Sequence, residues 1–238
     1  MLKRKILFFI SFWFFMIYCF AMLIPYVIMY LPVLNKRQQH LVYFMQWSWS
    51  RFCILISGAK IKFSGLENVP KDNIYCVVSN HQGMLDIPIL MRVFPWTLGF
   101  ITKKELLFFP ILNFWMLAVG CIFLDRKRPR NAVTVFERSV KQLRNAHPMA
   151  IFPEGTRSKT GEIAPFKPGA LKLVLKSQVP IIPVTIDGGG IMEGTNKTDD
   201  VFVTIHKKIE FSEIADLETA QIAAKIREII VAQVGKKV

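Results

Sequence analysis

Residues 74–86 read I-Y-C-V-V-S-N-H-Q-G-M-L-D, an apolar run that leads directly into polar residues. The short apolar run from Ile74 to Ser79 ends in polar residues, which is typical of a buried strand. His81 follows the run almost directly, at the end of a strand where α/β proteins commonly place their active groups. The stretch therefore predicts a strand that brings a histidine to the edge of a sheet.

Further short apolar runs have the same character, and they cover residues 97–101, 119–124, 149–152, 181–186 and 201–205. Between and after them, residues 133–143 and 222–234 carry apolar side chains at helical spacing. Strands that alternate with helices predict an α/β domain whose sheet is largely parallel and covered by helices. We expect this domain over residues 59–238 and a separate N-terminal segment over residues 1–58.

The N-terminal segment is long and apolar. Residues 6–35 contain no charged residue and are rich in Phe, Trp, Tyr, Ile, Leu and Met. The run is far longer than the apolar core of a signal peptide, and no small-x-small cleavage site follows it. About 20 apolar residues suffice to cross a bilayer, so the run is long enough for one transmembrane span. Pro25 and Pro32 predict that a helix ends or kinks within it.

A second apolar stretch, residues 40–57, follows a basic turn at residues 35–40. Two helices rich in interfacial aromatic residues, joined by such a turn, can lie together in one leaflet of a bilayer. The charges that flank the first run nearly cancel the bias that would orient a span. These charges belong to Lys3, Arg4 and Lys5 on one side and to Lys36 and Arg37 on the other. We favour the one-leaflet hairpin over the single span, and either one predicts a chain held at a membrane.

The chain carries 31 Lys and Arg against 17 Asp and Glu, a formal net charge of +14. Such an excess calls for an anionic partner, either nucleic acid or an anionic membrane surface. No zinc finger, RNA-recognition signature or heptad-bearing basic region accompanies it, so membrane lipids are the expected partner and nucleic acid is not. The four cysteines are scattered and form no C-x-x-C pair, which predicts buried thiols without a disulfide framework or a zinc site.

His81 and Asp86 have the spacing H-x-x-x-x-D. On one continuous helix they would point about 140° apart, so they meet only if His81 lies in a loop and a helix begins near Met84. Asp86 would then lie in the first helical turn, where a carboxylate is favourable, and could accept a hydrogen bond from one ring nitrogen of His81. Such a dyad is a general base for a hydroxyl or a water, although the spacing alone also arises by chance.

The hydroxyl that His81 would activate does not come from a recognisable nucleophile of the chain. No G-x-S-x-G elbow, Walker loop or G-x-G-x-x-G fingerprint occurs, and Gly188, Gly189 and Gly190 do not fit these patterns. We therefore expect the hydroxyl to belong to a substrate.

Residues 152–158 read F-P-E-G-T-R-S and open a turn-rich loop that continues to Pro168. Arg157 can grip a phosphate bidentately, and Gly155 lets the backbone approach that phosphate closely. The alternative is a plain turn in which Glu154 and Arg157 pair with each other. The motif alone leaves both interpretations open.

Four blocks occur in a characteristic order: N-H-Q-G-M-L-D at 80–86, G-C-I-F-L-D-R at 120–126, F-P-E-G-T-R-S at 152–158 and V-P-I-I-P-V at 179–184. Together they make the chain resemble the glycerolipid acyltransferase family over roughly residues 60–210, most closely the bacterial 1-acyl-sn-glycerol-3-phosphate acyltransferases. The stretches T-K-K-E-L and F-K-P-G-A also look like family features, and the two N-terminal helices are similar to those with which the family docks on membranes. Gly83 stands where the family often has Ser, a departure expected not to touch the dyad.

The resemblance implies a mostly parallel, mixed sheet covered by helices, and a catalytic dyad of His81 and Asp86. It implies transfer of an acyl chain from acyl-CoA or acyl carrier protein to the 2-hydroxyl of lysophosphatidic acid, with no metal and no other cofactor. The substrate-binding residues that it implies are Lys103, Arg126 and Arg157 for the phosphate and Glu154, Gly155 and Thr156 for the shape of the acceptor pocket. Pro180 and Ile181 would line a substrate wall or belong to the core.

Both donors are cytoplasmic, so the resemblance also implies a catalytic domain on the cytoplasmic side of the inner membrane. A single span would carry Lys3, Arg4 and Lys5 across the membrane against the usual bias, and the hairpin avoids this. Three alternatives stay open: an acyltransferase of the same family acting on another lyso-lipid such as a lyso-ornithine lipid, a metal hydrolase with His81, Asp86 and Glu154 as ligands, and a membrane adaptor without catalysis.

Overall fold

The computed structural model describes residues 2–28, 35–125, 129–196 and 198–236. Its centre is a seven-stranded sheet with the strand order β1-β7-β6-β2-β5-β3-β4. The strands are β1 (Lys60–Ser64), β2 (Cys76–Ser79), β3 (Gly99–Lys103), β4 (Ile122–Leu124), β5 (Met149–Ile151), β6 (Ile181–Asp187) and β7 (Asp200–Ile205). Neighbouring strands are parallel except for the antiparallel pair β6–β7. The prediction of a mostly parallel, mixed sheet is confirmed.

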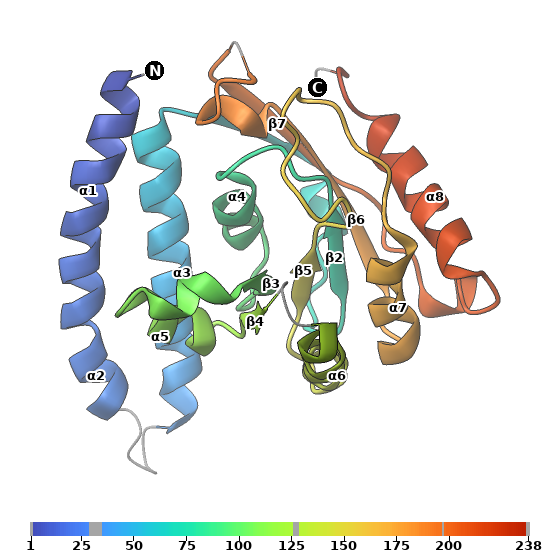
Figure 1. Ribbon diagram of the computed structural model, residues 1–238, viewed down its shortest axis with the longest axis horizontal. Coiled ribbons are helices and arrows are strands. Elements are labelled where there is room, and N and C mark those ends of the chain that lie inside the picture. Colours follow the sequence, from blue (N-terminus) through green and yellow to red (C-terminus); the bar gives the residue numbers. More distant parts are fainter. Residues whose placement is uncertain (1, 29–34, 126–128, 197, 237–238) are drawn as a thin grey trace.

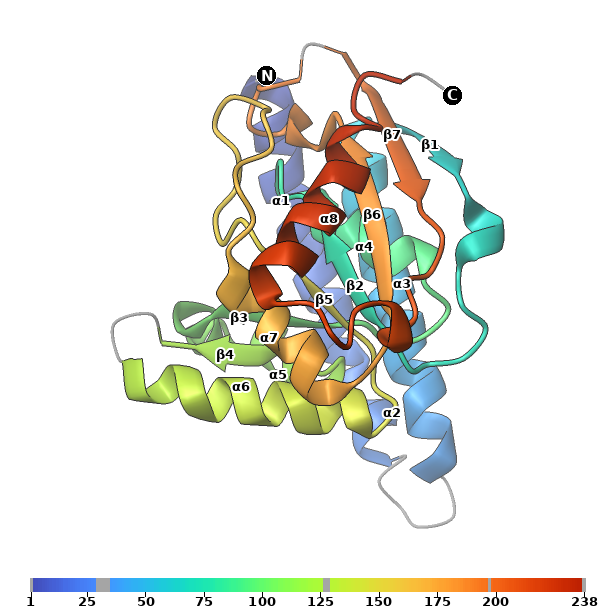
Figure 2. The same ribbon diagram turned by 90° about the vertical axis from the view of Figure 1, so that its right-hand side faces the viewer.

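Helices cover both faces of this sheet (Figures 1 and 2). The helices are α1 (Leu2–Ala21), α2 (Leu23–Ile28), α3 (Asn35–Ser57), α4 (Asp86–Val93), α5 (Leu112–Ala118), α6 (Pro129–Arg144), α7 (Pro168–Ser177) and α8 (Thr219–Val231). Short 3₁₀ turns lie at Leu66–Asn68, Lys104–Phe108, Gly189–Ile191 and Phe211–Glu213. The sheet thus lies between one layer that includes α3 and α4 and another that includes α7 and α8 (Figure 1).

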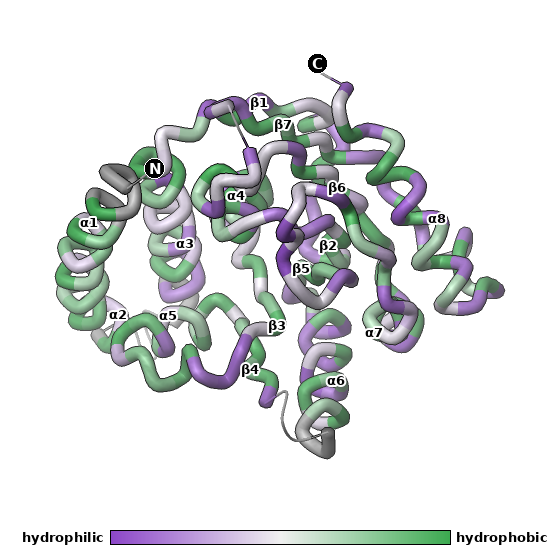
Figure 3. The backbone as a smooth tube through the Cα atoms, turned by 45° about the horizontal axis from the view of Figure 1, so that its top comes forward, coloured by the Kyte–Doolittle hydropathy of each residue, from purple (hydrophilic) through white to green (hydrophobic). Residues whose placement is uncertain are grey.

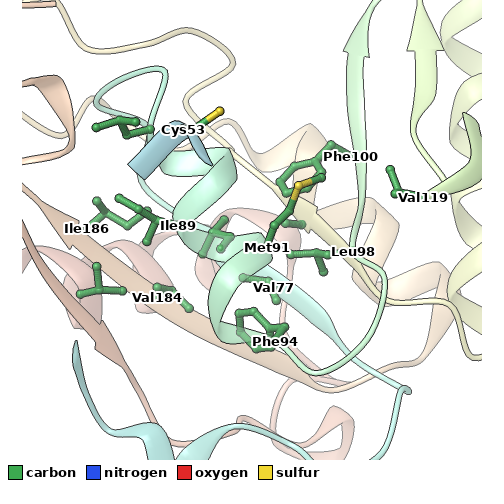
Figure 4. Packing of buried hydrophobic residues seen from close by; sticks show 14 of the residues in the cluster. Cys53, Val77, Ile89, Met91, Phe94, Leu98, Phe100, Val119, Val184 and Ile186 are labelled. Atoms are coloured by element: carbon green, nitrogen blue, oxygen red, sulfur yellow. The ribbon is translucent and has the colours of Figure 1, made fainter. Parts of the chain in front are cut away.

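Strand β2 shows why two cores form. Successive side chains of a strand point to opposite faces, so Val77 packs with the core around α4 while Cys76 and Val78 pack with the core under α7 and α8. All four residues of β2 are buried. Around α4, residues such as Ile89 and Phe94 meet the apolar face of β2 and β6, as Figure 4 shows. This packing fixes α4, and with it the start of the helix at Asp86.

Strand β1 was not among the strands predicted from the sequence. It lies at one edge of the sheet. In the described part of the chain, β7 is the one strand that pairs with it. Lys60 and Lys62 are exposed on it, and only Ile61 and Phe63 alternate with them toward the interior. Lysine is a common protection for a sheet edge, and it leaves too few apolar residues for a recognisable pattern. The predicted strands differ from those observed by up to three residues at their ends.

The N-terminal helices α1 and α3 run antiparallel beside the α/β body (Figure 1). Phe15 of α1 stacks on Phe52 of α3 at a centroid distance of 4.6 Å. The indole N–H of Trp115 in α5 donates to the carbonyl of Cys19 at 3.1 Å. The N-terminal helices therefore pack against the body. Separately, all four cysteines are buried free thiols, as predicted. The division of the chain between residues 58 and 59 stays a prediction.

Two expectations for the N-terminal segment have a definite outcome. Residues 35–40 form the first turns of α3 and not a separate turn, because Lys, Arg and Gln favour a helix as readily as the residues that follow them. Near Pro25 the helix is interrupted, with α1 ending at Ala21 and α2 starting at Leu23, so the kink is confirmed there. Pro32 lies outside the described residues.

The outer face of α1 is apolar and exposed, and the helix is green over most of its length in Figure 3. Its exposed large side chains include those of Phe9, Trp13, Phe14, Ile17 and Phe20. Within the described residues, the stretch Phe9–Val27 is the one that is long and apolar enough to cross a membrane. An apolar patch of this kind marks a surface for a membrane or a partner.

Candidate active site

The loop between β2 and α4 brings His81 and Asp86 together. Asn80 fixes the start of this loop, since its side-chain amide donates to the carbonyl of Ile186 at 2.7 Å and accepts the N–H of the same residue at 2.9 Å. His81 follows in the loop, and Asp86 is the first residue of α4, two residues later than the predicted start of the helix. The Nδ1 atom of His81 lies 2.7 Å from Oδ2 of Asp86.

Asp86 is 0% exposed, and its contacts gather on one carboxylate oxygen, Oδ2, while Oδ1 has no hydrogen-bond partner among the described residues. Its Oδ2 atom accepts the backbone N–H groups of Gln82 at 2.6 Å and Gly83 at 2.8 Å in addition to the contact with His81. Its position at the N-terminus of α4 adds the favourable end of the helix dipole. With an ionised Asp86 as acceptor, Nδ1 of His81 carries the proton and Nε2 is the basic nitrogen.

Contacts from the loop after β5 hold the His81 ring and backbone. The ring stacks on Phe152 at a centroid distance of 4.1 Å and an interplanar angle of 16°. The N–H of His81 donates to Oε1 of Glu154 at 2.7 Å, and its carbonyl accepts the N–H of Ser158 at 2.8 Å. The side chain of His81 is 14% exposed, so a substrate can reach a ring whose orientation is already set.

Glu154 is buried and joins two loops. Its second oxygen, Oε2, accepts the N–H of Ala164 at 3.0 Å, so each carboxylate oxygen has a backbone donor. Burial raises the pKa of Glu154, and these two hydrogen bonds partly oppose that rise. Because its oxygens are engaged in this way, Glu154 is a poor third ligand for the metal hydrolase that the sequence left open. In the described part of the chain, no group of three or more His, Cys, Asp and Glu side chains is arranged to hold a metal.

Arg157 does not pair with Glu154, so the alternative of a self-paired turn is wrong. Its guanidinium Nη1 lies 3.4 Å from Oε1 of Glu193, and the arginine side chain is about half exposed. Gly155 has a φ of +75°, a conformation that strongly favours glycine. A Cβ atom at Gly155 would also lie 2.8 Å from the Nζ atom of Lys167. Arg157 and Lys167 therefore place two cations around this turn, next to the exposed Thr156.

Lys103 is the last residue of β3 and is exposed. Since β3, β5 and β2 are parallel, Lys103 and His81 both lie at the carboxyl-terminal ends of the strands. Pro180 directly precedes β6, and Ile181 is the first residue of that strand, so both lie at the amino-terminal ends of the parallel strands. Ile181 is fully buried in the core under α7 and α8, which agrees with its interpretation as a core residue. Arg126 lies outside the described residues.

Comparison with known proteins identifies the family. A family model described as Acyltransferase matches residues 60–187, more than half of the chain. The chain belongs to the acyltransferase family. The match contains the dyad, the loop after β5 and the strands that carry them.

Relatives of this acyltransferase share much of its length. It is 31% identical over 189 residues to the 1-acyl-sn-glycerol-3-phosphate acyltransferase of Borreliella burgdorferi, with 76% of each chain covered. It is 35% identical over 210 residues to the chloroplastic 1-acyl-sn-glycerol-3-phosphate acyltransferase BAT2 of Brassica napus, where the match covers 86% of this chain and 59% of the relative. The crystal structure of the 1-acyl-sn-glycerophosphate acyltransferase PlsC from Thermotoga maritima matches with a TM-score of 0.84 at 25% identity, covering 100% of this chain and 97% of that one.

Two residues that sequence reasoning missed organise the site of this acyltransferase. Gln82 is buried, and its side chain accepts the N–H groups of Gly188 and Gly189 while it donates to the carbonyl of Gly161. Glu193 accepts the N–H of Met84 at 2.9 Å, in addition to its contact with Arg157. Gln82 lies inside the motif N-H-Q-G-M-L-D, but no pattern of the sequence indicates a role for its side chain. Glu193 follows the last of the four sequence blocks, which ends at residue 184.

The backbone of Gly83 contacts the dyad, and this contact does not depend on a side chain at this position. Its N–H donates to Asp86, and a Cβ atom at this position would collide with the carbonyl of Gly189 and with the carboxylate of Glu193. The absence of a side chain thus lets the loop after β6 close against the loop that carries His81.

Proposed function

We propose that this acyltransferase moves an acyl chain from an acyl thioester to the sn-2 hydroxyl of 1-acyl-glycerol-3-phosphate, giving phosphatidic acid. The observation that carries the proposal is the 2.7 Å contact between Nδ1 of His81 and the buried carboxylate of Asp86. It leaves Nε2 as a positioned base for a substrate hydroxyl. The printed names of the relatives from Borreliella burgdorferi and Brassica napus support the choice of acceptor.

The reaction follows from the dyad in two steps. Nε2 of His81 takes the proton of the hydroxyl as its oxygen attacks the thioester carbonyl, while Asp86 stabilises the imidazolium that forms. The carbon–sulfur bond then breaks, the ester is released, and the thiolate leaves. The thiolate becomes free thiol by taking the proton that Nε2 of His81 had accepted, which restores the neutral base. A thiol with an ordinary pKa of about 8.5 is a good leaving group, so little acid catalysis is needed. The thioester of acyl-CoA or acyl carrier protein is the co-substrate, and no cofactor enters these steps.

Arg157 and Lys103 supply positive charge for the acceptor's phosphate in this proposal, and Arg126 remains a third candidate. The ion pair of Arg157 with Glu193 is long and partly exposed. An exposed pair of this kind is worth about 1 kcal/mol or less, so a phosphate dianion can replace the carboxylate at little cost. Glu154 and Gly155 fix the turn that presents Arg157, with Thr156 exposed beside it.

We further propose that the protein lies on the cytoplasmic face of the inner membrane, with its N-terminal helices in one leaflet. The exposed apolar face of α1 supports contact with lipid. The packing of Phe15 on Phe52, and of Trp115 against Cys19, keeps α1 beside the body, which favours a hairpin over a separate span. Both acyl donors are in the cytoplasm, so the catalytic domain faces that side.

The test measures acceptor-dependent release of free thiol in liposomes, in parallel assays with and without EDTA. Acyl-CoA and acyl carrier protein are each supplied as donor, with lysophosphatidic acid, a lyso-ornithine lipid or no acceptor. The proposal predicts thiol release that requires lysophosphatidic acid, is unaffected by EDTA and yields phosphatidic acid. Release that requires the lyso-ornithine lipid would contradict the assigned acceptor, and no release with any pair would contradict the enzymatic role.

A further inference from the structure

A second group of cations lies away from the dyad, where α3 meets α4. The guanidinium carbons of Arg51 in α3 and Arg92 in α4 lie 5.7 Å and 5.1 Å from the centroid of the Trp47 ring. Each distance is within the range of a cation–π interaction. One indole therefore holds two positive side chains from two different helices near each other.

A cavity of about 320 Å³ opens at this point. Its lining consists of Arg51, Ile54, Leu55, Gly58, Ala59 and Arg92. Two guanidinium groups thus share a hollow with aliphatic side chains and a glycine backbone. The volume is at the lower end for sites that hold small molecules or parts of larger ones.

The positive charge of this cavity is not neutralised from within the described residues. There, neither Arg51 nor Arg92 has a carboxylate within ion-pair distance, whereas other cations such as Lys62 and Lys208 do. Two like charges that converge on one hollow are stabilised by an anion between them. A guanidinium fork matches the oxygens of a phosphate bidentately, so phosphate is the chemistry that fits best.

The surroundings of the cavity indicate that this phosphate belongs to a lipid. Leu55 forms part of the wall and is 75% exposed, and Phe44 is 49% exposed. At about 100° per residue, Phe44, Arg51 and Leu55 lie on one face of α3. That helix packs beside the exposed apolar helix α1. A tryptophan with snorkelling arginines is typical of the level of lipid headgroups.

We propose that Arg51, Arg92 and Trp47 bind the phosphate of an anionic membrane phospholipid, with its acyl chains over Leu55. This site is distinct from the active site, because Asp86 begins α4 and Arg92 lies in its last turn. Six residues of helix separate them by about 9 Å along the axis. The bound lipid anchors the α3–α4 junction at the membrane surface, whichever acceptor the dyad serves.

The experiment measures binding of the full chain to phosphatidylcholine vesicles with and without added phosphatidylglycerol. The test variant is the double substitution Arg51→Gln with Arg92→Gln. The matched control is Arg138→Gln with Lys141→Gln, which removes two exposed cations from α6 on the other side of the sheet. Thermal unfolding of both variants establishes that they are folded.

We expect the test variant to bind the anionic vesicles about tenfold or more weakly, because it loses two basic residues that contact the membrane surface. We expect the affinity of the control variant to change by less than about twofold. Binding to pure phosphatidylcholine changes little in either variant. Equal losses in the two variants would overturn the proposal in favour of a general charge effect. An unchanged test variant would overturn it outright.

A further arm separates a lipid from a soluble phosphate. Inorganic phosphate is added to vesicle-bound wild type at the same ionic strength as a chloride control. We expect no more release with phosphate than with chloride, because the lipid is held by its chains as well as by its headgroup. Release by phosphate alone, lost in the test variant, would show that the cavity takes a free anion and would overturn the lipid assignment.

Discussion

The guanidinium of Arg157 lies 3.4 Å from the carboxylate of Glu193, and that same carboxylate accepts the N–H of Met84 at 2.9 Å. The residue proposed to hold the acceptor's phosphate is thus linked through one side chain to the loop that carries His81. A phosphate bound to Arg157 can therefore affect the position of the loop that carries His81. Substitutions of Arg157 and of Glu193 are expected to change the KM for the acceptor in opposite directions.

Substituting Arg157→Ala is expected to raise the KM for lysophosphatidic acid by about tenfold to a hundredfold, because a hydrogen bond to a charged group is worth about 1.5–3 kcal/mol. The kcat is expected to fall less, since Arg157 does not contact the His81–Asp86 pair. Initial rates over a range of acceptor concentrations measure both constants. An unchanged KM would count against a phosphate clamp at this position.

Substituting Glu193→Gln is expected to lower the same KM by up to about fivefold, because it removes a carboxylate that competes with the phosphate in an exposed pair. Glutamine keeps an oxygen for the N–H of Met84, so the loop should stay in place. The same kinetic assay provides the measurement. A higher KM in this variant would mean that Glu193 positions Arg157 and does not compete for it.

Substituting Gly83→Ala is expected to reduce both kcat and the thermal unfolding temperature. The new Cβ would meet the carbonyl of Gly189, which is backbone and cannot rotate away, and the shift would disturb the N–H donated to Asp86. Gly169→Ala is the matched control, since a Cβ there meets nothing within 4 Å. In the first turn of α7 it should stabilise the fold by about 0.5–1 kcal/mol. Similar unfolding temperatures for the two variants would contradict the packing described at Gly83.

The stability of the fold should fall as the pH is lowered. Burial lowers the pKa of His147 and of His206 below the ordinary value of 6.5. As the pH falls through 6.5, the unfolded chain therefore binds protons that the folded chain does not, and the free energy of unfolding decreases. Glu154, with its raised pKa, acts in the opposite direction at lower pH.

Thermal unfolding from about pH 7.5 to about pH 5.5, across the range in which histidine titrates, measures this dependence. The double variant His147→Gln with His206→Gln should show a clearly smaller change over this range than the wild type, whatever its absolute stability. An equal change in both proteins would mean that these histidines do not cause the pH dependence.

Structure could be predicted from the sequence where the residues of one short segment are enough to determine it. The run before His81 is apolar throughout because β2 is buried on both faces, and it was therefore recognisable as a strand. The loop position of His81 followed from the geometry of a five-residue separation, since the pair can meet in no regular helix. Both features were predictable without knowledge of any distant contact.

Features that depend on distant partners could not be predicted in this way. Strand β1 is held at the edge by β7, which lies about 140 residues further along the chain, and its lysines hide the alternation of Ile61 and Phe63. The pairing of Arg157 with Glu193 requires the closure of the loop after β6, which no local pattern encodes. Likewise, Gly83 could be understood only once Gly189 lay against it.

In the proposed reaction His81 is the general base of an acyl transfer. The most direct test compares acceptor-dependent thiol release by the wild type and by His81→Ala in the same liposomes, with equal amounts of membrane-bound protein. We expect kcat to fall by about a hundredfold to ten-thousandfold in His81→Ala, which is the contribution of a positioned base, and membrane binding to stay unchanged. If His81→Ala released thiol at a rate close to that of the wild type, the general-base assignment would be wrong.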